Sequence, residues 1–197
     1  MTGEDTKRKQ ILDAAGMAFG QYGFRKTTLA DIVRESGVAR ATVYKYFPSK
    51  EEIFQAVIRR EISDILGTVR SAVEEQTSTY DRLRAAVMVQ SSTLRNKVNV
   101  FRLTMEAFTD VIGRTHSNME EMTAETVKLY TWILEEGVKA RDIFVDDIET
   151  TAWSLLLAFK GTFMTTVTGQ MQERLPAVMD RLVEILWDGL RCREEAA

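Results

Sequence analysis

Residues 28–50 read TLADIVRESGVARATVYKYFPSK, and this stretch decides the fold of the N-terminal part of the chain. Thr28 supplies a hydroxyl that can cap a helix, and apolar side chains follow it at helical spacing. Asp31 stands at the third helical position, where a negative charge favours the helix start. Gly37 ends this helix, because glycine adopts the left-handed backbone that a tight turn between crossed helices requires. A short second helix is predicted over residues 40–46, so the pattern indicates a helix-turn-helix.

The second helix carries a surface suited to DNA. Its outward side chains are hydrogen-bond donors without a single carboxylate, namely Arg40, Thr42, Lys45 and Tyr46. Such donors fit the major groove and its phosphates. Charge supports this interpretation, since residues 1–50 hold 9 Lys and Arg against 5 Asp and Glu, and the remainder holds 17 against 24. The two parts carry +4 and −7, which add to the −3 of the chain, and a basic module on an acidic body orients toward a polyanion.

The segment GVARATVYKYFPSK, residues 37–50, resembles the recognition-helix signature of the TetR family of bacterial transcriptional regulators. The resemblance covers about residues 8–57 and includes the Phe47–Glu52 entry into a further helix. It departs from the family pattern at three positions, with Ala39 for a capping serine, Ala41 for a glycine and Val33 for an alanine.

The resemblance also implies roles for single residues. The recognition helix is expected in the major groove, and phosphate-holding roles fall on Thr28, Tyr44 and Lys50. The DNA-binding residues predicted together are Thr27, Thr28, Arg40, Ala41, Thr42, Tyr44, Lys45, Tyr46 and Lys50.

The remainder of the chain is predicted to be helical, because alternating strand patterns are absent and both prolines stand where helices begin. Pro48 precedes a capping box formed by Ser49 and Glu52, and Pro176 opens the last helix. The predicted helices cover residues 7–21, 28–36, 40–46, 50–74, 80–96, 98–112, 118–140, 148–167 and 176–192. We therefore expect an all-α protein of about nine helices, with a three-helix DNA-binding domain at residues 1–49 and a helical effector-binding and dimerisation domain at residues 50–197.

Two segments near the C-terminus, residues 152–167 and 178–190, are apolar around nearly their whole circumference. Such helices must be covered on both sides, most simply by a second copy that completes a four-helix bundle about a two-fold axis. Helices that are central in a monomer would show the same pattern, but the family resemblance favours a homodimer. The predicted dimer contacts are Leu156, Phe163, Met164, Leu182, Ile185 and Leu186.

Residues 80–140 are rich in methionine and aromatic side chains, with polar residues on or beside the apolar stripes. Methionine and aromatic residues at helical spacing usually form core, but a few polar groups in an apolar cavity are typical of a ligand site. The resemblance implies an effector pocket in this domain. The predicted effector-binding residues are Gln90, Thr104, Met105, Phe108, Met122, Thr126, Tyr130 and Trp153.

The sequence offers little support for an enzyme, a metal site or a cofactor. The single histidine, His116, lies in a polar loop pattern without a second ligand, and the single cysteine, Cys192, excludes an intrachain disulfide. No apolar run reaches the ~20 residues of a membrane span, and a reducing, cytoplasmic location is expected.

Together these features predict a ligand-responsive transcriptional regulator, a repressor by preference, that binds palindromic double-stranded DNA as a homodimer and is released by a small, largely apolar effector. No membrane partner and no cofactor are expected. The alternative is a helical enzyme or adaptor whose N-terminal motif no longer binds DNA.

Overall fold

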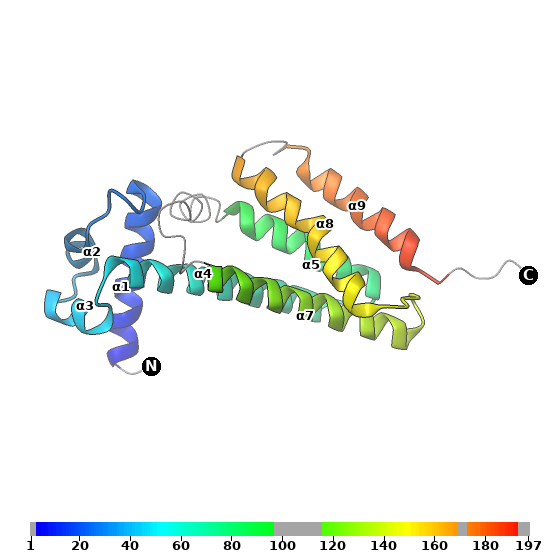
Figure 1. Ribbon diagram of the computed structural model, residues 1–197, viewed down its shortest axis with the longest axis horizontal. Helices are drawn as coiled ribbons and strands as arrows, with labels where there is room; N and C mark the ends of the chain where they lie inside the picture. The colour runs from blue at the N-terminus through cyan, green and yellow to red at the C-terminus, as the bar shows by residue number, and fades with distance from the viewer. Residues whose placement is uncertain (1–2, 97–115, 169–172, 193–197) are drawn as a thin grey trace, which may run out of the picture. The chain divides into compact units, whose positions relative to one another are not determined.

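A computed structural model of the chain describes residues 3–96, 116–168 and 173–192, without the side chains of residues 94, 96, 116–119 and 162–168. These residues form eight α-helices and no strand, which confirms the all-α prediction (Figure 1). The helices are α1 (Gly3–Tyr22), α2 (Leu29–Ser36), α3 (Arg40–Tyr46), α4 (Lys50–Glu74), α5 (Thr79–Asn96), α7 (His116–Ala140), α8 (Ile148–Thr168) and α9 (Leu175–Leu190). The helix predicted over residues 98–112 lies outside the described residues.

The chain falls into two compact units. Of the described residues, 3–63 and 116–119 belong to the first unit, and 64–96, 120–168 and 173–192 belong to the second. Helix α4 therefore contributes residues to both. The domain boundary expected from the sequence, between residues 49 and 50, stays a prediction.

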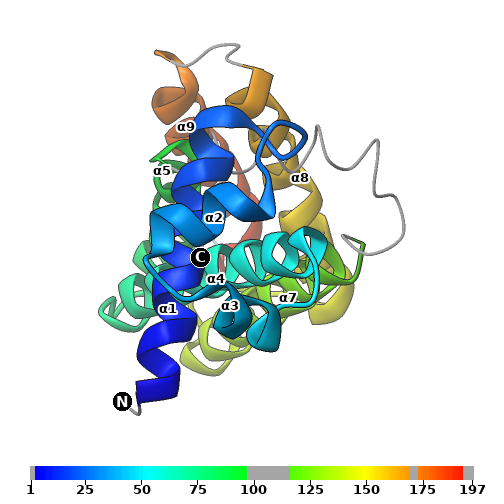
Figure 2. The same cartoon turned by 90° about the vertical axis from the view of Figure 1, so that its left-hand side faces the viewer.

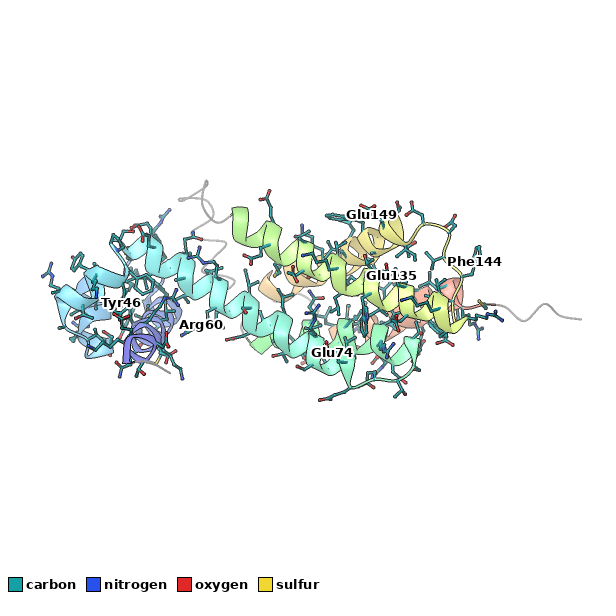
Figure 3. All side chains as sticks on the ribbon, turned by 90° about the horizontal axis from the view of Figure 1, so that it is seen from below. Tyr46, Arg60, Glu74, Glu135, Phe144 and Glu149 are labelled. Carbon is teal, nitrogen blue, oxygen red and sulfur yellow. The ribbon has the colours of Figure 1, made fainter. Side chains whose placement is uncertain are left out.

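The core of the first unit is built on three phenylalanines. Phe19 of α1, Phe24 of the following turn and Phe54 of α4 lie with ring centroids 4.8–5.8 Å apart. All three are buried, and α1 packs against α2 beside them. Arg60 of α4 adds a polar link, since it donates to Asp13 Oδ1 at 2.7 Å (Figure 3). The aromatic contacts and this ion pair hold α1 and α4 together as a support for α2 and α3.

In the second unit α5 packs against both α8 and α9, and the three helices run side by side in Figures 1 and 2. Tyr130 of α7 meets Phe159 of α8 with ring centroids 6.2 Å apart. Gly137 of α7 marks a close approach, because a Cβ there would lie 2.5 Å from Thr79 Cγ2 and 2.9 Å from Ile143 Cδ1. The first turn of α5 therefore packs directly on the backbone of α7.

The connection between α7 and α8 pairs with the end of α9. Phe144 N donates to Leu190 O at 2.9 Å, and Cys192 N donates to Asp142 O at 3.1 Å. The Phe144 side chain itself points away from the protein (Figure 3). His116, expected in a loop, is instead the first residue of α7. Among the helices that the structure describes, none is long and apolar enough to cross a membrane.

Candidate nucleic-acid interface and ligand cavity

Thr28 caps helix α2, as the sequence predicts, and it does so in a capping box with Asp31. The Thr28 hydroxyl accepts a hydrogen bond from Asp31 N at 3.2 Å, while Thr28 N donates to Asp31 Oδ2 at 3.0 Å. The Thr28 hydroxyl also lies 2.6 Å from Asp31 Oδ2. The bond from the Thr28 hydroxyl, and after it the bond from Thr28 N, hold the pKa of Asp31 below its ordinary value. Arg34 makes a smaller contribution. The carboxylate is therefore fixed in its ionised form, and the start of α2 is ordered.

The turn between α2 and α3 is set by Gly37, which has φ 65° and ψ 9° in the left-handed region. Val38 is buried beneath this turn, and Val43 of α3 is fully buried. Ala39 stands at the N-cap of α3 without a side-chain cap bond. Since Val38 and Val43 face inward, the opposite side of α3 is left toward solvent, as a helix-turn-helix requires.

The exposed side of α3 carries the predicted donors, and Figure 2 shows this helix toward the viewer. Arg40, Ala41, Tyr44 and Lys45 are exposed, and Thr42 and Tyr46 are half-buried. Their arrangement places two basic groups and two tyrosines on one short helix.

Two side-chain contacts order this surface. The Arg40 guanidinium lies 5.5 Å from the centre of the Tyr44 ring and donates to the Tyr44 hydroxyl at 3.4 Å. Lys45 Nζ lies 3.6 Å from Glu4 Oε1 of α1, in a pair whose side chains are both largely exposed. Such exposed pairs exchange readily, so Lys45 is available to a phosphate.

Two of the predicted DNA-binding residues have internal roles. Thr27 is 1% exposed, and its hydroxyl bonds to Gly23 O at 2.8 Å and to Ala18 O at 3.2 Å. Its side chain therefore stabilises the turn before α2 and does not reach the surface. The Lys50 ammonium donates to Phe24 O at 2.9 Å and to Thr27 O at 3.0 Å. It also lies 4.3 Å from the centre of the Phe24 ring, so Lys50 ties the start of α4 to the turn between α1 and α2.

A small cavity lies within the second unit. It is lined by residues of α4, α5 and α7, namely Ile65, Leu66, Val69, Ala86, Gln90, Met122, Thr126, Leu129 and Tyr130. The volume open to the centre of a water molecule is about 10 Å³, roughly what one water needs. The Thr126 hydroxyl donates to Met122 O at 2.8 Å, and Tyr130 is 1% exposed.

Four of the predicted effector-binding residues line this cavity together: Gln90, Met122, Thr126 and Tyr130. Trp153 does not, because its side chain is exposed on α8. Thr104, Met105 and Phe108 lie outside the described residues. Sequence reasoning missed the α4 wall, Ile65, Leu66 and Val69, since these residues show the apolar spacing of any core helix.

The predicted dimer contacts also separate in the structure. Leu156 is buried within its own unit, whereas its neighbour Leu157 is 63% exposed. Because α8 is apolar all round, spacing alone could not decide which side faces outward. Ile185 of α9 is 55% exposed, and Leu182 and Leu186 are half-buried. The side chains of residues 163 and 164, both predicted contacts, are not described.

A capped helix-turn-helix on a basic unit defines a DNA-binding protein of the helix-turn-helix class. Residues 11–57 match the family model described as bacterial regulatory proteins, tetR family. The N-terminal part of the chain is therefore similar to this family of transcriptional regulators, as the sequence resemblance predicts.

Similarity to known proteins also extends over nearly the whole chain. The chain is 25% identical over 194 residues to the HTH-type transcriptional repressor KstR2 of Rhodococcus jostii, which covers 92% of this chain and 93% of that protein. Two solved structures share the fold at lower identity. A TetR-family regulator from Mesorhizobium loti superposes with a TM-score of 0.83 at 18% identity, over 98% of this chain and 100% of the other. FadR of Bacillus subtilis in complex with stearoyl-CoA superposes with a TM-score of 0.67 at 20% identity, over 92% of this chain and 98% of the other.

Proposed function

We propose that this regulator is a homodimeric repressor that binds a palindromic operator and is released by a small, largely apolar effector. The observation that carries the proposal is the ordered helix-turn-helix, with its donors outward on α3 and no carboxylate among the residues of that helix. The repressor name of the R. jostii relative supports the negative sign of regulation. A regulator of this kind acts where the chromosome lies, so a cytoplasmic location is part of the proposal.

The DNA contacts divide into two kinds. Arg40 begins α3 and is exposed, so we assign it to a base edge, where an arginine reads guanine by two hydrogen bonds. Thr28, Tyr44 and Lys45 are assigned to phosphates, which position the protein without reading sequence. Ala41, Thr42 and Tyr46 complete the predicted groove-facing set. Lys50 supports this surface from behind through its bonds to the turn before α2.

Apolar side chains exposed on α8 and α9 support the homodimer. Trp153 and Leu157 are four residues apart on α8, and Val178 and Ile185 are seven apart on α9, so each pair lies on one side of its helix. Large apolar groups at this spacing on two helices would leave an unfavourable surface in a monomer. A second copy covers it, and a two-fold axis then gives two recognition helices for one palindrome.

The cavity supports an effector. Its lining is apolar with a few polar groups, and it belongs to the unit that holds the end of α4. Its small volume means that a ligand must enlarge it, which displaces the α4 side chains Ile65, Leu66 and Val69. The stearoyl-CoA complex of the B. subtilis structure is an example of a ligand with a long apolar acyl chain on this fold. A coupling of about 1–3 kcal/mol between ligand and DNA would change operator affinity by roughly 5–150-fold.

Selection of binding sites from random duplex DNA tests the proposal. The expected product is a palindrome whose half-sites are about 34–36 Å apart or a multiple of that distance, with a dissociation constant on the order of 10⁻⁸–10⁻¹¹ M at physiological salt. Arg40→Ala should relax discrimination at particular base positions, at a cost of roughly 1–3 kcal/mol. Tyr44→Phe keeps the ring beside Arg40 and should weaken all sequences alike. Selection of no sequence would contradict the proposal and favour an adaptor that no longer binds DNA. Full-strength binding by a stable monomer would contradict the homodimer.

A further inference from the structure

The buried hydroxyl of Tyr130 is unusual among the described residues. It is the one buried side-chain polar atom that the described part of the chain leaves without a hydrogen-bond partner. Burial raises the pKa of Tyr130 far above its ordinary value, so the hydroxyl keeps its proton. A buried donor without a partner costs stability, whereas a phenylalanine at the same place would not.

Packing explains the ring of Tyr130 but not its oxygen. The ring lies against Phe159 and completes the wall of the cavity, and phenylalanine would do both equally well. Unsatisfied buried polar groups concentrate at functional sites, where a ligand supplies the missing partner. The hydroxyl therefore needs an explanation from outside the folded chain.

The chemistry of the cavity limits what that partner can be. None of the nine described residues that line it carries a charge. A carboxylate or ammonium group placed here would be desolvated without a counter-charge, which is strongly unfavourable. Thr126 spends its proton on Met122 O and can act toward a ligand as an acceptor alone. A neutral oxygen acceptor on an otherwise apolar molecule fits the Tyr130 donor and the uncharged lining.

We propose that Tyr130 is a specificity-determining residue whose hydroxyl donates to an uncharged oxygen of the effector, a ketone, ester or hydroxyl oxygen, within the apolar cavity. This inference rests on the proposed function, because it assumes that the effector enters this cavity. It adds the chemical class of the bound part of the ligand, which is neutral and carries one hydrogen-bond acceptor at the end near Tyr130. It also excludes a carboxylate end from this position.

Thermal unfolding of the ligand-free protein is the first test and needs no ligand. Tyr130→Phe should leave the Tm unchanged or raise it by a few degrees, because it removes an unpaired buried donor and keeps the ring. Tyr80→Phe is the matched control, since Tyr80 belongs to the same unit, packs against Trp187 and does not line the cavity. A Tm of Tyr130→Phe several degrees below that of the wild type would show that the hydroxyl is bonded within the protein and would overturn the inference.

The second test compares three probes of one shape, indane, 2-indanone and indane-2-carboxylate, by ligand-observed NMR. The wild type should bind the ketone about three- to tenfold more tightly than the hydrocarbon, which is the contribution of one neutral hydrogen bond. The carboxylate should bind most weakly. In Tyr130→Phe the ketone should fall to the affinity of indane, while indane itself is unchanged, and Tyr80→Phe should alter neither.

The two possible failures are distinguishable. Equal binding of ketone and hydrocarbon by the wild type, or an equal loss of both in Tyr130→Phe, would overturn the role of the hydroxyl and leave an apolar effector site intact. Binding of none of the three probes, together with an unchanged Tm on Tyr130→Phe, would count against an effector in this cavity and so against the proposed function itself.

Discussion

Replacing Lys50 by methionine tests whether this residue positions the DNA-binding surface or contacts DNA directly. Methionine keeps most of the length and the apolar character of the side chain but removes the ammonium. Two charge-assisted hydrogen bonds, of 2.9 and 3.0 Å, and a cation–π contact of 4.3 Å are then lost. Because the site is half-buried, water hydrogen-bonds to part of the groups that lose Lys50. We therefore expect the free energy of unfolding to fall by about 2–3 kcal/mol. For a chain of this length that corresponds to a Tm lower by roughly 4–12 °C.

The salt dependence of DNA binding separates the two roles. The plot of log K against log salt concentration has a negative slope, and loss of one phosphate contact makes it less steep by about 0.9. Loss of a residue that only positions the surface lowers the affinity at every salt concentration and leaves the slope unchanged. We expect Lys50→Met to weaken operator and random DNA with an unchanged slope. Lys45→Met is the control, because Lys45 is exposed and has a weak surface pair with Glu4. Lys45→Met should change the free energy of unfolding by less than about 0.5 kcal/mol and make the salt dependence less steep by about 0.9.

The opposite pattern would refute this reasoning. If Lys50→Met were as stable as the wild type and reduced the salt slope, the ammonium would be a phosphate contact, as the family resemblance implies. Its bonds to Phe24 O and Thr27 O would then contribute nothing measurable to the folded state.

Three further predictions concern helix packing, helix capping and dimerisation. Gly137→Ala should lower the free energy of unfolding by about 1–3 kcal/mol in chemical denaturation, because its Cβ would lie 2.5 Å from a neighbouring side-chain carbon. Gly67→Ala, in open space on α4, is the control and should raise it by about 0.5–1 kcal/mol. Equal effects of the two variants would contradict the close packing. The pKa of Asp31 is held below its ordinary 3.8 by the hydroxyl of its capping threonine. Its stabilising effect is therefore present at neutral pH and is lost as the pH falls through that lowered value. Asp31→Asn should reduce this loss of stability at acid pH, followed by circular dichroism. Leu157→Asp should shift sedimentation toward the monomer. Phe144→Asp, at a residue that is more exposed than Leu157 but lies outside α8 and α9, should not, and a monomeric wild type would remove the basis of the comparison.

The parts of the structure that depend on near neighbours were predictable from the sequence. Thr28 caps α2 through Asp31, three residues away, and Gly37 ends it through its own backbone conformation. Helix α3 begins and ends as predicted, and so does α4, because caps, proline and apolar spacing act within one or two turns. The capping box expected at Ser49 is present in part, since Glu52 N donates to Ser49 Oγ at 3.2 Å.

The parts that depend on distant contacts were not predictable. Lys50 bonds to carbonyls 23 and 26 residues earlier, and nothing in the local sequence distinguishes it from a solvent-exposed lysine. Leu156 is buried and Leu157 exposed because the other helices of the unit, among them α5, pack on one side of α8, which is apolar around nearly its whole circumference. In the cavity, polar residues on apolar stripes were a usable signal for Thr126 and Tyr130.

Helix α4 gives the two halves of the proposed function a physical connection. Ile65 of the cavity wall and Lys50 of the first turn belong to the same helix. A ligand that displaces the α4 side chains of the cavity wall therefore acts on the helix that also carries Lys50 in its first turn. Since Lys50 holds Thr27 O, and Thr28 caps α2, a displacement of this turn acts on the start of α2 without any ligand contact to the DNA-binding residues. A ligand in the cavity can therefore change operator affinity if it favours one tilt of α4, and linkage requires that DNA weaken ligand binding by the same factor.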